Sequence, residues 1–328
     1  MSARPRSDAE WMAAAARLAA RARPISRPNP GVATIIVKDG RVLATGWTRV
    51  GGRPHAEADA LSSLKPGESK GATFYVTLEP CAHTSNRGPA CSDIISAQGP
   101  ARVVIGQRDP DQRTAGKGIA KLEAAGIAVT TLEDAASYRS VAGFLTRQNA
   151  GRPYVTLKLA QSLDGCIALA DGTSQWITGP EARAHCHALR ARHEAILVGG
   201  GTWRADKPRL TVRLPGLDGR SPDRVILTRG VQPDGVRVIN TPEQIAELDG
   251  VLHLYIEGGA ATAASFLKAD LVDELHLYQA PIVIGGDGLG SLADLGLSDL
   301  STAHGRWREA QSARLGSDRF TAYLRTRN

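Results

Sequence analysis

Strand-like and helix-like segments alternate along the first half of the chain. Apolar runs rich in β-branched residues predict strands over residues 32–37, 42–47, 73–78, 101–106 and 127–132. Helices are expected over residues 8–23, 55–64, 91–98 and 117–125. The first helix opens with a capping-box pattern, Ser7 followed by Glu10, and Lys38-Asp39-Gly40 predicts a hairpin turn. This order predicts a three-layer α/β domain over residues 1–149.

The second half also alternates strands with helices, after a linker expected at residues 149–153. Strands are predicted over residues 154–159, 166–169, 195–198, 224–227, 251–256 and 274–278, and a helix over residues 180–192. Two Gly-rich turns follow strands, at Gly199–Thr202 and Glu257–Thr262. Either one alone is also typical of a tight turn, and neither matches a Rossmann or P-loop motif. Two in one α/β domain, residues 150–328, favour a nucleotide cofactor.

Composition and charge narrow the class of protein. The 328 residues are enough for two domains, 42% of them are hydrophobic, and no apolar run is long enough to cross a membrane. The net charge of +7 suits an anionic partner, either a phosphorylated small molecule or nucleic acid, and plain solubility fits as well. The arginines are scattered, so nucleic acid has no special support. Cys166 and Cys186 lie in no motif and are expected to be free thiols. Arginines interrupt the Ala-rich N-terminal stretch, so it does not match a signal peptide, and a cytoplasmic protein is expected.

The most specific motif combines His55-Ala-Glu57 with Glu-Pro-Cys81 and Cys91. One histidine and two cysteines can hold Zn²⁺ with three protein ligands and leave the fourth position for water. Zinc lowers the pKa of that water from about 15.7 toward about 7, and Glu57 is placed to move protons. The pattern is typical of zinc-dependent base deaminases. The alternative is a purely structural zinc site, which an open three-ligand set fits less well.

Nine residues separate the two cysteines instead of the usual two. The loop, residues 82–90, is polar and contains turn-forming residues. It can keep both thiolates on the metal and also reach into the pocket. His83 and Arg87 are therefore candidates for substrate contact, although a surface-loop histidine is an equally good interpretation of His83.

The whole chain resembles one family, the bifunctional deaminase/reductase of riboflavin biosynthesis. The resemblance rests on residues 28–30, 54–58, 77–81 and 91, and in the second half on residues 158–165, 174–178, 189–191, 198–202, 210–213 and 257–259. It implies a cytidine-deaminase-like domain followed by a dihydrofolate-reductase-like domain. The first would deaminate 2,5-diamino-6-(5-phosphoribosylamino)pyrimidin-4-one with zinc. The second would reduce the ribosyl group of the product to ribityl with NADPH.

The resemblance also implies roles for individual residues. Zinc would be held by His55, Cys81 and Cys91, with Glu57 catalytic. Lys158 and Asp206 would act beside the hydride-transfer centre. NADPH would contact Ala160, Trp176, Thr202, Asp206, Gly259, Ala260, Ala261, Thr262, Ala263, Ala264 and Ser265. Substrates would contact Asn29, His83, Ser174, Arg190, Leu210, Arg213 and Glu257.

Arg190 and Arg213 suit a phosphate clamp, because guanidinium binds phosphate oxygens with two hydrogen bonds. Surface charge on a basic protein is the other interpretation. One departure affects the reductase half: the family's Asp-Asp-Pro is Asp206-Lys207-Pro208 here, so the second acid has become a base. The cysteine loop is also one residue longer than the family pattern, which could move His83 or Arg87.

Two other functions remain open at this stage. One is a nucleic-acid base deaminase with an appended domain, although no RNA-binding signature is present. The other is an active reductase with a non-catalytic deaminase-like scaffold, which the intact Glu57 disfavours. His185 and His187 could suggest a second metal site, but two residues apart they face different sides of a helix, so a solvated or core position is expected for them. Phosphorylated pyrimidines are the expected partners, with no nucleic acid and no membrane, and a homo-oligomer is expected.

Overall fold

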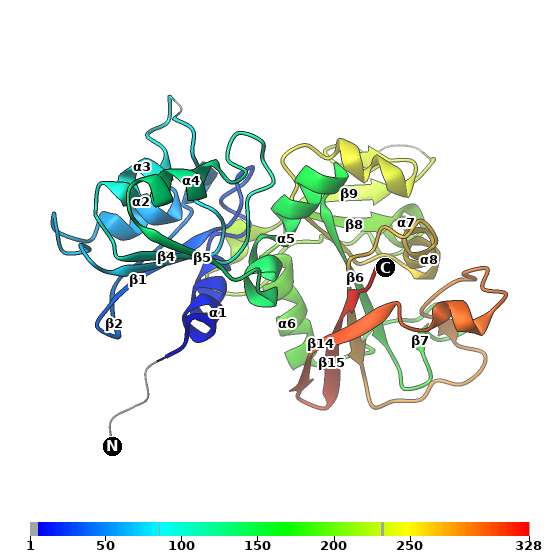
Figure 1. Cartoon of the computed structure of the whole chain (residues 1–328). Coiled ribbons are helices and arrows are strands. Elements are labelled where there is room, and N and C mark those ends of the chain that lie inside the picture. The colour runs from blue at the N-terminus through cyan, green and yellow to red at the C-terminus, as the bar shows by residue number, and fades with distance from the viewer. Residues whose placement is uncertain (1–5, 85, 231–232, 328) are drawn as a thin grey trace, which may run out of the picture. The chain divides into compact units, whose positions relative to one another are not determined.

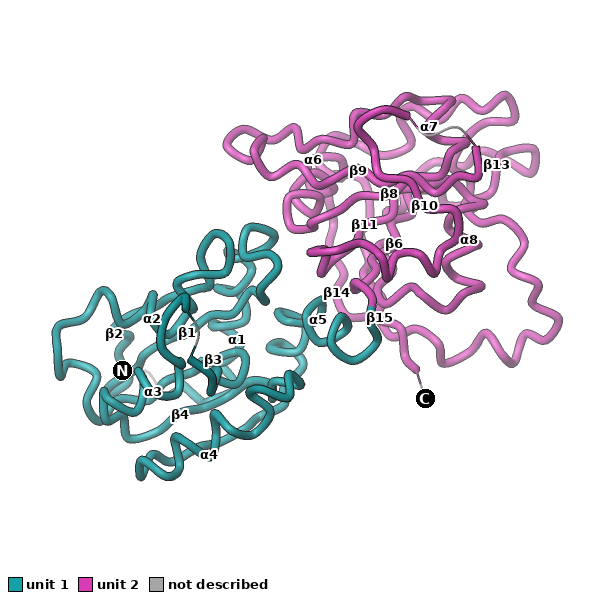
Figure 2. Tube along the Cα trace, turned by 90° about the horizontal axis from the view of Figure 1, so that it is seen from above, with its two compact units in different colours: residues 1–151 teal, residues 152–328 magenta. Residues whose placement is uncertain are grey.

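The protein folds as two compact units, residues 1–151 and 152–328 (Figure 2). The computed structural model describes residues 6–84, 86–230 and 233–327. Ser85, within the cysteine loop, lies outside the described residues. No helix in the described ranges is both long and apolar enough to span a membrane.

The first unit is built on a five-stranded sheet in the order β2-β1-β3-β4-β5 (Figure 1). Its strands are β1 (Ala33–Lys38), β2 (Arg41–Trp47), β3 (Thr73–Val76), β4 (Arg102–Ile105) and β5 (Ala128–Thr131). Its helices are α1 (Asp8–Ala19), α2 (Ala56–Leu61), α3 (Cys91–Ser96), α4 (Lys117–Ala124) and α5 (Ala135–Ala150). β1 pairs antiparallel with β2 and β3, while β3, β4 and β5 run parallel. The carboxyl ends of β3 and β4 therefore lie at the same edge.

Alternating side chains of the strands divide the core of this unit into two layers. Ile36 and Phe74 belong to the larger cluster, which includes residues of α2, α3 and α4. Ile35 and Tyr75 face the other way and pack with Trp11 of α1. Ser7 caps α1 and forms the predicted capping box with Glu10. The first unit is thus the three-layer α/β domain that the sequence predicts, although α1 ends four residues earlier than residue 23.

Helix α5 is the main error in the prediction for this unit. It runs over 16 residues, capped by Asp134, whose side chain accepts from the backbone N–H groups of Ala136 and Ser137. Its last turn includes Asn149 and Ala150, which were assigned to the linker. Gly151, with φ of 68°, ends the helix, because a residue without Cβ adopts the left-handed conformation easily. The connection between the units is consequently shorter than expected.

The second unit contains an eight-stranded sheet in the order β10-β9-β8-β11-β6-β12-β15-β14. Its strands are β6 (Tyr154–Gln161), β8 (Ala195–Gly199), β9 (Asp223–Leu227), β10 (Arg237–Ile239), β11 (His253–Ile256), β12 (Glu274–Gln279), β14 (Trp307–Leu315) and β15 (Asp318–Arg325). β7 (Cys166–Ala168) and β13 (Leu289–Gly290) form a separate two-stranded sheet. The helices are α6 (Pro180–Arg190), α7 (Gly200–Asp206) and α8 (Ala260–Lys268). Short 3-10 turns occur at Val50–Gly52 in the first unit and at Asp218–Arg220, Pro242–Glu247 and Leu300–Ala303 in the second.

Helices cover both faces of this sheet. Ala263 and Phe266 of α8 pack with Leu157 and Leu254 on one face. Cys186 of α6 belongs to the core cluster of the other face, which contains Tyr255, Tyr278 and Phe320. The six strands from β10 to β12 are parallel, so their carboxyl ends share one edge.

The sequence did not predict β10, β13 or the C-terminal hairpin of β14 and β15. β15 adds antiparallel to β12, and β14 adds antiparallel to β15 at the edge of the sheet. Most side chains of β14 are exposed or half-buried, so this strand lacks the apolar run by which the other strands were recognised.

Candidate active sites

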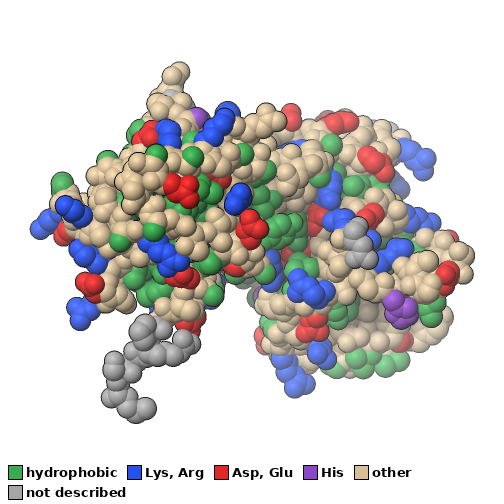
Figure 3. Space-filling view, in the orientation of Figure 1, with side chains coloured by type: hydrophobic (Ala, Val, Ile, Leu, Met, Phe, Trp, Pro, Cys, Tyr) green, Lys and Arg blue, Asp and Glu red, His purple; other side chains and the backbone are tan. Residues whose placement is uncertain are grey.

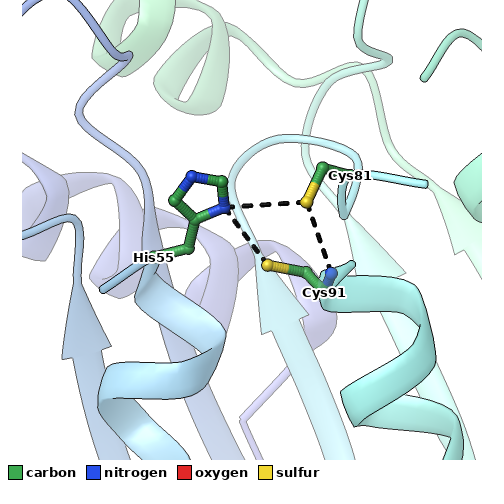
Figure 4. A group of neighbouring side chains, drawn as sticks. All are labelled: His55, Cys81 and Cys91. Atoms are coloured by element: carbon green, nitrogen blue, oxygen red, sulfur yellow. Dashed lines mark hydrogen bonds between the residues drawn. The ribbon is translucent and has the colours of Figure 1, made fainter. Parts of the chain in front are cut away.

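The three predicted metal ligands meet at the carboxyl-terminal edge of the first sheet, two of them at helix starts. His55 is the N-cap of α2, Cys91 is the first residue of α3, and Cys81 lies beyond the end of β3. His55 Nδ1 is 3.3 Å from Cys91 Sγ and 3.7 Å from Cys81 Sγ. Figure 4 shows the three side chains pointing toward one another. The three donor atoms lie within 4.8 Å of one another. One nitrogen and two sulfurs at this spacing fit a zinc ion, which favours such donors.

The surroundings shift the pKa values of the two cysteine thiols in opposite directions. A hydrogen bond from the Cys91 thiol lowers the pKa of Cys81 to about 4, and bonds from His55 and from the backbone N–H of Cys91 add to the effect. Donation of the Cys91 proton to Cys81, together with burial, raises the pKa of Cys91. Two adjacent thiolates would repel each other, so the pKa values of the two groups move in opposite directions. A divalent cation at this point removes that repulsion, so the donor set is suited to a metal.

Glu57 lies in the first turn of α2 and is only 3% exposed. Burial raises the pKa of its carboxyl group, and the charge of His55 acts in the opposite direction. A carboxylate with a raised pKa can accept a proton and release it again near neutral pH. Glu57 lines the same cavity as His55 and Cys81, where proton transfer is needed for hydrolysis.

This cavity has a volume of about 340 Å³ and brings together five predicted site residues. They are Asn29, His55, Glu57, Cys81 and His83. The amide nitrogen of Asn29 is 3.3 Å from the carbonyl oxygen of Gly52 and 3.4 Å from His55 Nε2. The buried Nδ1 of His83 has no hydrogen-bond partner within the described ranges. Arg87 also lines the cavity and donates to the carbonyl oxygen of Gly51.

Several residues of this cavity were not predicted. Asp109 follows β4, and burial raises the pKa of its carboxyl group to about 7. Asp111 pairs with Arg113, which lowers the pKa of Asp111 to about 2. Phe144 lines the cavity from α5, the helix that the sequence analysis did not recognise. Asp109 and Asp111 could have been found from the sequence, because they follow a predicted strand. The carboxyl ends of parallel strands lie at one edge of a sheet, where the metal ligands also lie.

Glu79 has a structural role beside the metal ligands. Its buried carboxylate accepts hydrogen bonds from four backbone N–H groups, at 3.1–3.3 Å. The donors are Asp109, Gly116, Gly118 and Ile119. Gly118 has no side chain because a Cβ there would come 2.1 Å from the carbonyl oxygen of Pro80. Glu79 thereby fixes the start of α4 against the strand end that leads to Cys81.

In the second unit, the two Gly-rich turns lie side by side at the carboxyl ends of β8 and β11. A Cβ at Gly199 would lie 2.1 Å from Thr262 Oγ1, and one at Gly259 would lie 3.2 Å from Thr202 Oγ1. Within the second turn, a Cβ at Gly258 would lie 2.7 Å from Thr262 Cβ. By contrast, a Cβ at Gly201 would meet no atom within 4 Å. The glycine backbone of each turn therefore packs against a threonine hydroxyl that follows the other turn, and space is left beside Gly201, as a dinucleotide cradle requires.

A cavity of about 500 Å³ extends from these turns. The predicted residues that line it are Lys158, Ala160, Ser174, Trp176, Arg190, Thr202, Asp206, Leu210, Arg213, Glu257 and Gly259. Trp176 is 63% exposed there, with the guanidinium of Arg183 4.7 Å from its ring centre. Lys207, which replaces the family's second acid, also lines the cavity and has a positive φ of 42°.

The remaining residues of the predicted cofactor segment do not line this cavity. Ala263 is 0% exposed and packs in the core with the strands, and Ala264 and Thr262 are also buried. Ala261 is exposed, while Ala260 and Ser265 are half-buried. Most of α8 therefore faces the sheet or solvent.

Two arginines in this cavity differ in their partners. Arg190 forms a two-point ion pair with Glu257, with Nε–Oε1 of 2.5 Å and Nη2–Oε2 of 2.7 Å, and also donates to the Thr211 carbonyl. Although burial opposes ionisation, the charge of Arg190 lowers the pKa of Glu257 to about 2. Arg213 forms no ion pair with any described residue, and its guanidinium is 3.3–3.4 Å from His187 Nε2.

His187 was expected to be a solvated or core residue, but it lines the cavity. The backbone N–H of Arg213 lies 3.3 Å from its Nδ1. Burial, with the charges of Arg190 and Arg213, lowers the pKa of His187 to about 4. His185 faces the sheet instead and contacts the Tyr278 hydroxyl at 2.9 Å. The two histidines thus do face different sides of α6, and neither belongs to a group of metal-binding side chains among the described residues.

Comparisons with known proteins match a family to each of the two units. The cytidine and deoxycytidylate deaminase zinc-binding region matches residues 5–107, and the RibD C-terminal domain matches residues 153–320. The riboflavin biosynthesis protein RibD of Escherichia coli is 39% identical over 347 residues, covering 90% of this chain and 94% of that protein. RibD of Aquifex aeolicus is 36% identical over 95% of this chain and 96% of that protein.

A solved structure has the same two-domain fold. It is a diaminohydroxyphosphoribosylaminopyrimidine deaminase/5-amino-6-(5-phosphoribosylamino)uracil reductase from Thermotoga maritima. It is 31% identical, with a TM-score of 0.85, and the match covers 97% of this chain and 99% of that one. Fold and sites therefore define a deaminase–reductase with one zinc-binding and one reductase domain. The chain belongs to the RibD family of riboflavin biosynthesis proteins.

Proposed function

We propose that this chain catalyses two consecutive steps of riboflavin biosynthesis. The first is hydrolysis of the 2-amino group of 2,5-diamino-6-(5-phosphoribosylamino)pyrimidin-4-one. The second is NADPH-dependent reduction of the ribosyl group of 5-amino-6-(5-phosphoribosylamino)uracil to ribityl. The observation that carries the proposal is the pairing, in one chain, of a buried His-Cys-Cys donor set beside Glu57 with a separate cavity at two converging Gly-rich turns.

In the first domain, His55, Cys81 and Cys91 hold zinc. Zinc bound there supplies a Lewis acid that makes water nucleophilic at neutral pH. Glu57 accepts a proton from the attacking water and delivers one to the leaving amino nitrogen. Its burial supports this role, because a raised pKa brings the carboxyl group closer to the pH at which it works.

Asn29 and His83 contact the pyrimidine substrate in this proposal. His83 lines the cavity, and its buried Nδ1 has no hydrogen-bond partner among the described residues, which supports a contact with a ligand. Asn29 also lies against His55 Nε2, so it can orient both the substrate and the metal-binding ring. The retained donor set and Glu57 favour a catalytic domain over a scaffold.

In the second domain, Lys158 and Asp206 handle protons beside the site of hydride transfer, while the hydride comes from NADPH. The proposed NADPH contacts are Ala160, Trp176, Thr202, Asp206 and the segment Gly259–Ser265, including Ala260, Ala261, Thr262, Ala263 and Ala264. For the buried members of this segment only backbone contact is compatible with their packing. Ser174 and Leu210 line the substrate side of the cavity.

The substrate phosphate binds Arg213 in this proposal. Arg213 has no carboxylate partner in the described ranges, so its charge is available to an anion. Arg190 is already neutralised by Glu257 and instead holds that carboxylate in the cavity. Glu257, fixed in this way, can accept hydrogen bonds from substrate hydroxyl groups.

The cellular setting follows from the same chemistry. A phosphorylated metabolite, NADPH and four free cysteines are consistent with the cytoplasm. On the face shown in Figure 3, basic and acidic side chains are interspersed, an arrangement that suits small phosphorylated ligands better than nucleic acid. Assembly into a homo-oligomer remains a prediction.

The test is to give the zinc-loaded protein the diaminopyrimidinone ribosyl phosphate and follow ammonia and NADPH together. Ammonia should appear without NADPH, and stoichiometric NADPH oxidation should follow its addition. Ammonia without oxidation would contradict the reductase assignment and direct attention to Lys207. No reaction from folded, zinc-loaded protein would contradict the substrate assignment.

A further inference from the structure

The second unit contains another cavity, on the face of the sheet opposite to the proposed reductase site. Its volume is about 440 Å³. Consecutive side chains of a strand point to opposite faces, and β6 shows the two sides. Ala160 packs with the core cluster on the side of α6, whereas Leu159 belongs to the cluster that α8 covers, where this cavity lies. Among the described residues, Leu159 is the one that lines both cavities. The cavity is therefore a separate site that neither proposed reaction uses.

The walls of this cavity are mainly apolar. Leu267 of α8, Leu275 of β12 and Trp307 of β14 contribute to it from the body of the domain. The segment between β13 and β14 contributes three further leucines, Leu292, Leu295 and Leu297. Leu297 is 49% exposed, so part of the apolar wall is open to water. Cavities of about 300–1,000 Å³ with mostly apolar walls and a few polar groups are typical of small-molecule sites.

Hydrogen bonds hold both ends of the segment that carries these three leucines. Near its start, the backbone N–H of Ala293 donates to the carbonyl oxygen of Ala260, the first residue of α8, at 3.3 Å. At its end, the carbonyl oxygen of Arg306 accepts from the backbone N–H of Thr326 at 2.8 Å and from Arg325 Nη1 at 3.1 Å. The protein's own contacts therefore fix the walls, and a preformed cavity loses little binding free energy to ordering.

Basic side chains also line this cavity. Arg325 pairs with Asp270 at 2.8 Å, and its guanidinium lies 5.8 Å from the centre of the Trp307 ring. Lys268 and Arg306 are exposed, and neither forms an ion pair with any residue that the structure describes. Three basic groups thus accompany one carboxylate, which leaves net positive charge beside an apolar interior. A neutral apolar ligand would leave Lys268 and Arg306 unpaired, whereas an anionic group would bind them with charge-assisted hydrogen bonds.

We propose that this cavity binds a small amphiphilic anion. The aliphatic or aromatic body of the ligand lies among the leucines and Trp307, and its carboxylate, sulfonate or phosphate group binds Lys268 and Arg306. The inference goes beyond the two proposed reactions, whose ligands are placed in the other two cavities. A second copy of the chain could also cover Leu297, but it would have to bring an acidic group to pair with Lys268 and Arg306.

The test measures binding of 8-anilinonaphthalene-1-sulfonate, whose fluorescence rises in apolar surroundings, to the full-length protein with and without NADP⁺. One molecule of this probe should bind per chain in both conditions. Decanoate should displace the probe, and decanamide, which has the same chain without the charge, should do so about tenfold or more weakly. The double variant Lys268→Met/Arg306→Met should weaken the probe and decanoate about tenfold or more, because both charge-assisted contacts are lost, and leave decanamide unchanged.

Arg314→Met/Arg319→Met is the matched control. It removes the same charge from two exposed arginines that face each other in the β14–β15 hairpin and do not line the cavity, so binding should stay at the wild-type level. Leu297→Gln places a polar group in the apolar wall and should weaken decanoate and decanamide alike.

The proposal is overturned if the probe shows no saturable binding, or if NADP⁺ displaces it, which would place it in the reductase cavity. It is also overturned if wild type binds decanamide as tightly as decanoate, or if Lys268→Met/Arg306→Met binds the probe as well as the control variant does. Sedimentation that shows a dimer which Leu297→Gln dissociates would overturn it too, since a second copy would then cover the cavity.

Discussion

Arg190 and Glu257 form a two-point ion pair inside the reductase cavity, although 67 residues separate them in the sequence. Their side chains are 13% and 8% exposed, so neither charge is well solvated without the other. Arg190 is held in place by the Thr211 carbonyl as well. The guanidinium that the sequence predicts as a phosphate clamp is therefore engaged mainly with the protein itself.

This pairing predicts that loss of Arg190 affects stability as well as catalysis. Arg190→Met leaves the Glu257 carboxylate buried without its partner, which should cost about 3–5 kcal/mol of unfolding free energy in the second domain. Denaturant titration of the second domain measures the loss. The double variant Arg190→Met/Glu257→Gln should recover much of it, because no unpaired charge remains. If the single and double variants are equally unstable, the ion pair is not the cause.

Arg213 should behave in the opposite way, because its charge has no carboxylate partner in the part of the chain that the structure describes. Arg213→Met should raise KM for the ribosyl phosphate substrate about tenfold or more while leaving stability within about 0.5 kcal/mol. Steady-state reductase kinetics with the pre-deaminated intermediate give the comparison. A substrate analogue without phosphate should bind wild type and variant equally, and a difference there would argue against a phosphate contact.

Glu57→Gln keeps the shape of the side chain but removes the proton acceptor. Ammonia release should fall by about two to four orders of magnitude, the range that general acid–base catalysis contributes. Zinc content, measured by metal analysis, and NADPH oxidation with the pre-deaminated intermediate should match wild type. Equal loss of both activities from a folded protein would mean that the two active sites are not independent.

Stability of the second domain should depend on pH through His187. The environment lowers its pKa from 6.5 to about 4, so the folded domain favours the neutral ring. The domain therefore keeps its full stability above pH 6.5 and loses it progressively as the pH falls from 6.5 toward 4, where the unfolded chain binds the extra proton. Calorimetry at several pH values, with the transition assigned by its shift on adding NADPH, measures this slope. His187→Gln should reduce it, and an unchanged slope would exclude His187 as the source.

Phe144 should contribute to pyrimidine binding in the deaminase cavity, because aromatic and apolar faces stack on nucleobases. Phe144→Leu keeps most of the apolar packing of α5 but removes the ring. KM for the diamino substrate should rise several-fold with a smaller change in kcat. Leu145, buried on the same helix, is a control position, since Leu145→Val should affect stability alone. A Phe144→Leu variant with wild-type KM would show that the ring does not contact the substrate.

The metal centre could be predicted from the sequence because its chemistry requires few residues at short spacing. His55, Glu57 and Cys81 carry recognisable local patterns, and the helix starts that position them also carry local signals. The same holds for the Gly-rich turns, which follow clear apolar strands. What the sequence could not supply was that the two turns meet, because contact between them depends on the order of β8 and β11 in the sheet.

Other site residues depend on long-range contacts or on elements with weak patterns. Phe144 lies on α5, a helix of small and polar residues whose buried positions include Ser137 and Gly143, so it shows no clear apolar stripe. The pairing of Arg190 with Glu257 has no local signal at all. The sequence did not place His187 in the cavity. A helix pattern indicates which way a side chain points, but it does not show that the segment around Arg213 packs against it.

Glu79 is neither a metal ligand nor a proposed catalytic group, yet its carboxylate joins two parts of the deaminase domain. It sits two residues before Cys81 and accepts four backbone N–H groups from the segment between Asp109 and Ile119. Hydrogen bonds of this one side chain therefore connect the segment that leads from β3 to Cys81 with the segment that forms one wall of the cavity. The metal site and the cavity wall that carries Asp109 therefore share one buried anchor, and neither is built independently of the other.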